Sequence, residues 1–131
     1  MSVKDKGSNA ERELIHLFWK SGWACIRAAG SGVQRYPSPD IIVGNGSRRM
    51  VLECKASKAT KKYLEKQEIE QLQEFSKKFG AEPYIALRFD RHEWYFVSLD
   101  DLEKTKNNFV VEMDSAKKKG LVFEELIGNF Q

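Results

Sequence analysis

The sequence has very little cysteine or histidine and no long apolar run. Its two cysteines, Cys25 and Cys54, lie in apolar strand patterns without another Cys or His at ligand spacing. We therefore expect two buried free thiols, with neither a disulfide nor a zinc site. No apolar run reaches the roughly 18 residues that a membrane-spanning helix needs. No signal-peptide core follows Met1, so a cytoplasmic protein is expected.

The two histidines also offer no catalytic pattern. His16 falls opposite the apolar stripe of the first predicted helix, and His92 falls in a predicted turn, so both are expected at the surface. A length of 131 residues, 41% apolar and 31% charged, is typical of one soluble domain. Neither internal repeats nor a long linker divides it, which predicts a single domain over residues 1–131.

The net charge is only +3, but the charges are unevenly spread. Residues 1–66 hold 13 Lys and Arg against 6 Asp and Glu, whereas residues 67–131 hold 9 against 13. A basic face of this kind favours a polyanionic partner. The alternative is a lysine surface that is simply solvated, and the charge alone does not separate the two.

The order of predicted elements is helix, strand, strand, strand, helix, strand, strand. It predicts an α/β domain with a central mixed five-stranded β-sheet flanked by helices. Ser8 as N-cap and Glu11 three residues later form a capping-box pattern that would open the first helix after a loose segment 1–7. The chain further predicts the following segments: a helix to residue 21, strands 23–27, 41–43 and 50–55, a loop 28–39, a helix 65–79 capped by Gly80, strands 83–89 and 93–97, a short turn or helix at 100–102, edge strands 109–113 and 121–123 around a lysine turn 117–119, and a short helix 124–130.

Acidic side chains and a lysine gather around the second and third predicted strands. Asp40 opens an apolar run, Gly44-Asn45-Gly46 turns the chain, and the next run leads into Glu53-Cys54-Lys55. Because strand side chains alternate, Glu53 and Lys55 share one face at the strand end, near Asp40 of the neighbouring strand.

Glu11 has two interpretations, because it also lies at the edge of the stripe formed with Leu14 and Phe18. It either caps the helix or turns a carboxylate towards the sheet. Three carboxylates suit Mg²⁺, and the carbonyl of Cys54 could add a ligand. Lys55 could stabilise negative charge on a phosphate. The alternative for Lys55 is an ordinary surface salt bridge.

Taken together, the chain resembles the PD-(D/E)XK nuclease superfamily and, more narrowly, the archaeal Holliday-junction-resolving endonucleases. The resemblance covers about residues 4–100, and the tail after residue 100 matches poorly. It is carried by five segments in order: residues 6–14, 27–31, 40–46, 53–55 and 72–76.

The resemblance implies a restriction-endonuclease-like fold and a homodimer that nicks four-way DNA junctions in opposite strands with Mg²⁺ or Mn²⁺. It implies that Glu11, Asp40 and Glu53 hold the metal, and that Lys55 and the loop residue Ser31 are catalytic. Basic and loop residues are expected to contact DNA: Arg12, Arg27, Ser31, Arg35, Lys58, Lys61 and Lys62. A helicase or sliding clamp as a further partner is not indicated by the sequence.

Two other functions stay open from sequence alone. One is a general or restriction-like nuclease, and the other is a non-catalytic DNA-binding module on the same fold. The surface for dimerisation is also open. Apolar residues near the C-terminus and around 94–96 either form it or complete the core: Val110, Val111, Leu121, Phe123, Ile127, Trp94, Tyr95 and Phe96.

Overall fold

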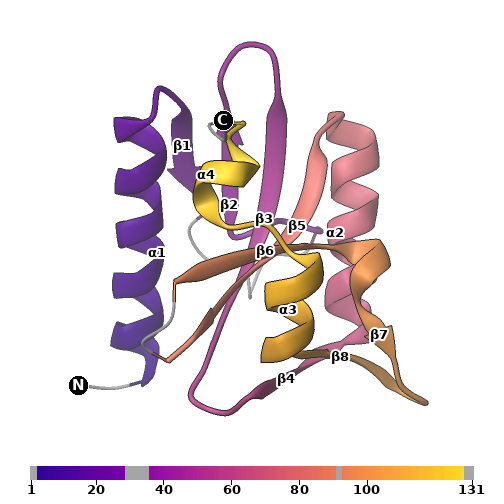
Figure 1. The fold of residues 1–131 in the computed structure, drawn as a ribbon. Helices are drawn as coiled ribbons and strands as arrows, with labels where there is room; N and C mark the ends of the chain where they lie inside the picture. Colours follow the sequence, from indigo (N-terminus) through magenta and orange to yellow (C-terminus); the bar gives the residue numbers. More distant parts are fainter. Residues whose placement is uncertain (1–2, 29–35, 91–92, 129–131) are drawn as a thin grey trace. The chain divides into compact units, whose positions relative to one another are not determined.

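The computed structural model of the chain describes residues 3–28, 36–90 and 93–128, with side chains from Asn9 onwards (Figure 1). A five-stranded sheet has the order β1-β2-β3-β5-β6, and a three-stranded sheet has the order β4-β8-β7. The predicted α/β class with a mixed five-stranded sheet and helices is thus confirmed. In chain order the elements are α1 (Val3–Lys20), β1 (Ala24–Arg27), β2 (Ile41–Gly44), β3 (Arg49–Ser57), β4 (Lys61–Glu65), α2 (Lys66–Phe79), β5 (Glu82–Phe89), β6 (Trp94–Ser98), the 3-10 turn η2 (Leu99–Asp101), β7 (Glu103–Lys104), β8 (Asn108–Glu112), α3 (Met113–Lys119) and α4 (Phe123–Leu126).

Contacts group the chain into two compact units. The first comprises residues 1–54 and 72–83, and the second comprises residues 55–71 and 84–131. Strands β3 and β5 and helix α2 each run from one unit into the other. The single domain over residues 1–131 stays a prediction. In the part of the chain that the structure describes, every helix is too short or too polar to cross a membrane.

Helix α1 belongs to the first unit and begins earlier than the sequence predicted. It starts at Val3, so Ser8 lies within the helix and the predicted N-cap at Ser8 is wrong. Leu14 and Phe18 are fully buried on its apolar stripe. The helix ends at Lys20, as expected from Gly22, whose φ of +85° favours a residue without a side chain.

The β2–β3 hairpin of the same unit is antiparallel, with Ile41 opposite Leu52 and Val43 opposite Met50. Its turn is held by the Asn45 side chain, whose Oδ1 accepts hydrogen bonds from the backbone N–H groups of Ser47 and Arg48 at 2.9 and 2.7 Å. The centre of β3 is buried on both faces, because Met50, Val51 and Leu52 are all at 0% exposure.

The second unit departs from the sequence prediction in three places. A lysine-rich segment that was not assigned to a strand forms β4, and it pairs antiparallel with β8. The predicted lysine turn at 117–119 is wrong, because these residues are the end of helix α3. The predicted strand 121–123 is also wrong: Leu121 makes one isolated bridge to Phe96, and α4 begins at Phe123. Helices α3 and α4 both pack on β6.

Candidate active site

Asp40 is fixed at the point where the chain enters β2. Its backbone N–H donates to the Leu52 carbonyl at 3.0 Å, and its carbonyl accepts from the Ala28 N–H at 2.8 Å. The side chain is fixed as well, since Asp40 Oδ2 accepts from the backbone N–H of Cys54 at 2.8 Å. The carboxylate is therefore held against the β3 segment that carries the Glu53-Cys54-Lys55 motif.

Glu11 reaches the same place from helix α1. It lies well inside the helix, so the interpretation as a capping-box residue is wrong. Its Oε2 lies 2.5 Å from Arg27 Nε, and the Glu11 side chain is 16% exposed. Burial raises the pKa of the Glu11 carboxyl, and the nearby Asp40 raises it further, while Arg27 acts in the opposite direction.

The structure brings two of the three predicted metal ligands together. Ligand atoms of Glu11, Asp40 and Cys54 lie within 4.8 Å of one another, the Cys54 atom being its sulfur. Among the described residues this group does not include Glu53. Glu53 nevertheless lies close enough for its charge to add to the rise in the pKa of the Cys54 thiol.

The donor set fits a hard divalent cation through its oxygens. Two carboxylates supply the ligands that Mg²⁺ and Mn²⁺ prefer. Sulfur binds metals as the thiolate. Burial, with added repulsion from Asp40 and Glu11, raises the pKa of the Cys54 thiol well above its usual value. Cys54 therefore offers a neutral thiol, and both cysteines are free thiols as predicted, with Cys25 buried and Cys54 half-buried.

Lys55 follows Cys54 in β3 and pairs with a residue that the sequence analysis did not single out. Its Nζ lies 2.5 Å from Oε2 of Glu68 in helix α2, and the two side chains are only 23% and 27% exposed. The pair is thus more buried than the ordinary surface salt bridge considered from sequence. No sequence signal distinguishes Glu68 from the other acids of α2, because the pairing depends on how the helix meets the strand.

The predicted DNA-contacting residues have varied surroundings. Arg12 is exposed and donates from Nη1 to Asn9 Oδ1 at 3.2 Å. Lys58 is exposed, and Lys62 is half-buried. Lys61 lies 3.7 Å from a carboxylate oxygen of Glu112.

Three predicted positions fall outside the described residues: Ser31, Arg35 and His92. His16 is exposed, as predicted.

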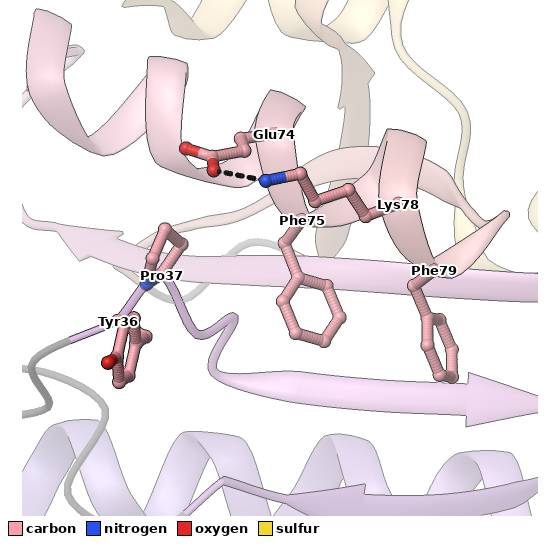
Figure 2. A pocket seen from close by; sticks show the side chains of 6 residues that line it. All are labelled: Tyr36, Pro37, Glu74, Phe75, Lys78 and Phe79. Carbon is pink, nitrogen blue, oxygen red and sulfur yellow. Dashed lines mark hydrogen bonds and ion pairs between the residues drawn. The ribbon is translucent and has the colours of Figure 1, made fainter.

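The first unit also contains an apolar pocket that was not predicted from the sequence. It has a volume of about 360 Å³ and is lined by one loop segment and one face of α2: Tyr36, Pro37, Glu74, Phe75, Lys78 and Phe79. Figure 2 shows the rings of Phe75 and Phe79 projecting from the same side of α2, with Tyr36 and Pro37 beside the helix. Phe75 and Phe79 lie one helical turn apart, a spacing that in sequence is typical of a stripe facing the core.

Comparison with known proteins identifies the family. The model of the archaeal Holliday junction resolvase family, Hjc, matches residues 2–131, including the tail that the sequence resemblance left out. The chain belongs to this family. Crossover junction endodeoxyribonuclease Hjc of Archaeoglobus fulgidus is 43% identical over 128 residues, covering 98% of this chain and 93% of the relative. Hjc of Methanocaldococcus jannaschii is 40% identical, covering 94% and 87%.

A solved structure agrees with this assignment. The structure of Archaeoglobus fulgidus Hjc, described as a Holliday junction resolvase from an archaeal hyperthermophile, matches with a TM-score of 0.87 at 40% identity. The match covers 96% of this chain and 98% of that chain. The site described above is therefore interpreted as that of a nuclease of the Hjc family.

Proposed function

We propose that this Hjc-family chain is a structure-selective endonuclease that resolves four-way DNA junctions by paired, metal-dependent nicks in opposite strands. Family membership over residues 2–131 supports the reaction class. The observation that carries the proposal is the convergence of Glu11 and Asp40 from separate elements beside the strand of the Glu53-Cys54-Lys55 motif. Carboxylates gathered in this way repel one another unless a cation lies between them.

Glu11, Asp40 and Glu53 are the proposed ligands of Mg²⁺, for which Mn²⁺ would substitute. When bound, a divalent cation neutralises the phosphate and lowers the pKa of an attacking water. The hydrogen bond from the Cys54 N–H keeps the Asp40 carboxylate in one orientation. Lys55 is proposed to donate to a phosphate oxygen or to the attacking water.

The basic residues are proposed to hold the DNA backbone. Arg12 and Arg27 lie on α1 and β1, and Arg27 also balances the charge of Glu11. Lys58, Lys61 and Lys62 add positive charge around β4, and Ser31 and Arg35, which precede Asp40 in the sequence, are proposed to add further contacts. Contacts of this kind read the phosphate backbone rather than the bases, so selectivity would come from the shape of the junction.

The direct test replaces Asp40 by asparagine, which is isosteric but a poor ligand. The Asp40→Asn variant should lose junction cutting by at least about a hundredfold, while its binding to a labelled four-way junction stays within about twofold. Normal cutting by this variant would refute the proposed site.

A competition assay separates the resolvase from a general or restriction-like nuclease. Wild-type protein with Mg²⁺ should keep cutting the junction in excess linear duplex, and its products should be nicked in opposite strands. Loss of cutting under competition favours the general nuclease, whereas binding without any cutting favours a non-catalytic module.

A homodimer is proposed because two symmetric cuts need two sites. Most of the apolar candidates from sequence do not supply an exposed surface, since Val110, Val111 and residues 94–96 are buried in the chain itself. The remaining candidates are half-buried: Leu121, Phe123 and Ile127. The pocket on α2 is more exposed, because Tyr36 and Phe79, which line it, are 72% and 44% exposed.

The charged residues that line the pocket on α2 are self-complementary, which means that two copies of the chain could pair them across a two-fold axis. Glu74 and Lys78 line the pocket and pair with each other at 2.8 Å. Across a two-fold axis with antiparallel α2 helices, each could equally face the opposite charge of the partner. We therefore assign the dimer contact to this pocket.

A further inference from the structure

The pair of Lys55 and Glu68 differs from the other lysine ion pairs among the described residues. Its atoms are 2.5 Å apart, against 2.8 to 3.9 Å for the pairs of Lys61, Lys66 and Lys78. Both of its side chains are less than 30% exposed, whereas each partner in those other pairs is at least 48% exposed. Exposed pairs of that kind contribute little and exchange readily with water.

The placement of Glu68 explains why the carboxylate stays in place. Glu68 lies in the first turn of α2, where the partial positive charge of the helix N-terminus favours an anion. Its neighbour Ile69 is buried at 3% exposure, which anchors this turn of the helix in the core. The carboxylate is thus carried by a fixed element rather than by a loop.

A lysine side chain is long and flexible, and fixing it in one rotamer costs side-chain entropy. A carboxylate already in place lowers that cost when the substrate arrives. The ammonium group has three N–H donors, so a lysine held by an ion pair can also donate to a phosphate oxygen or a water.

We propose that Glu68 is a positioning residue, which holds the Lys55 ammonium on the strand so that it meets the scissile phosphate without rearrangement. This inference rests on the proposed function, because it requires Lys55 to act in cutting. Glu68 itself does not contact the substrate, and its effect passes entirely through Lys55.

The test uses Glu68→Gln, which keeps the shape and removes the charge, and Glu68→Asp, which keeps the charge. The control is Glu70→Gln, since Glu70 is an exposed acid of the same helix that pairs with Lys66. In single-turnover cutting of a labelled junction with Mg²⁺, Glu68→Gln should be slower by about tenfold to a hundredfold. Glu68→Asp should recover part of this loss, and Glu70→Gln should match wild type.

Binding and melting measurements separate positioning from a structural role. The Kd of Glu68→Gln for the junction, measured without divalent metal, should stay within about twofold of wild type. Its melting temperature should stay within a few degrees. A rate loss that merely follows a large fall in melting temperature, or a weaker Kd that accounts for the whole loss, overturns the proposal.

The decisive comparison repeats Glu68→Gln in a Lys55→Ala background, with enzyme in excess and long incubation so that slow cutting is measured. If Glu68 acts through Lys55, the second change causes no further loss. An equal loss in both backgrounds overturns the proposal. If Lys55→Ala cuts normally, the catalytic role of Lys55 itself is wrong. If Lys55→Ala is slow and Glu68→Gln cuts normally, only the role of Glu68 is wrong.

Discussion

Cys54 contributes to the candidate site through its backbone and not through its sulfur. The backbone N–H orients Asp40 at 2.8 Å, whereas the thiol, although close to both carboxylates, is neutral because burial raises its pKa. A change of side chain at this position should therefore leave the hard-cation site intact.

The neutral thiol and the oxygen ligands predict the metal requirement of two variants. Cys54→Val should need the same Mg²⁺ concentration for half-maximal cutting as wild type, within about twofold, because Mg²⁺ seeks oxygen and the backbone donor is kept. Glu11→Gln should need at least about tenfold more, because it loses a ligand charge. Titration of the cutting rate with Mg²⁺ checks both. A Cys54→Val requirement as high as that of Glu11→Gln would make the sulfur a ligand.

The buried thiol of Cys25 predicts how stability depends on pH. Burial raises the pKa of Cys25 from 9.0 to about 12. Below pH 9 the thiol is neutral in both the folded and the unfolded chain and has no effect. Between pH 9 and 12 only the unfolded chain ionises, so the free energy of unfolding falls by about 1.4 kcal/mol per pH unit.

Urea unfolding of wild type and Cys25→Ala at pH 8 and pH 10.5 measures this difference. The variant is expected to be less stable at pH 8, because it loses a buried side chain, and to lose less stability on the step to pH 10.5. Equal losses over that step in the two proteins would contradict a buried, neutral thiol.

Which side chains lie close together could be predicted from the sequence where the two-residue period of a strand determines their neighbours, and not elsewhere. Asp40 and the Glu53-Cys54-Lys55 motif were located because a turn between two apolar runs brings both to one edge. Glu68 was missed because it meets Lys55 across thirteen positions, from a helix onto a strand. Only the packing of the two elements decides that contact.

At the scale of elements, helix α2 has the clearest sequence signals. Its span and its stop at Gly80 were predicted, and Gly80 has a φ of +79° with its N–H donating to the Ser76 carbonyl at 2.9 Å. By contrast, the start of α1 and strand β4 were missed. The sequence of β4 does not show the alternation of apolar and polar residues that is typical of a strand, because it is rich in lysine and only Leu64 is fully buried there. Pairing with β8 stabilises the strand.

The cap of α2 yields a stability prediction. Gly80→Ala should lower the free energy of unfolding by about 1 kcal/mol, because alanine resists the left-handed conformation. Gly80→Asn should cost less, since asparagine tolerates it. Urea unfolding of the three proteins gives the order. If Gly80→Ala is as stable as wild type, the helix does not depend on this cap.

For the molecule as a whole, the fold class was predictable and the mode of assembly was not. The order of helices and strands follows from local periodicity, so the five-stranded sheet could be inferred. A dimer contact produces no such periodic pattern in the sequence. Phe75 and Phe79 look like core residues in the sequence, and only the structure shows Phe79 to be 44% exposed beside a pocket.

The proposed dimer contact is tested by placing a charge in that pocket. Phe79→Glu should shift the protein from dimer to monomer at micromolar concentration in sedimentation, because an unpaired carboxylate cannot be buried in an apolar interface without a large cost. Gln73→Glu is the matched control, since it adds the same charge at an exposed position of α2 that does not line the pocket. It should remain dimeric.

Loss of the dimer should also change the products. A plasmid carrying an extruded four-way junction becomes linear when both strands are cut within one encounter, and nicked when only one is cut. The control variant should give linear product, and Phe79→Glu should give nicked circles, because a monomer carries one site. A Phe79→Glu protein that stays dimeric and linearises the plasmid would place the two-fold contact elsewhere on the chain.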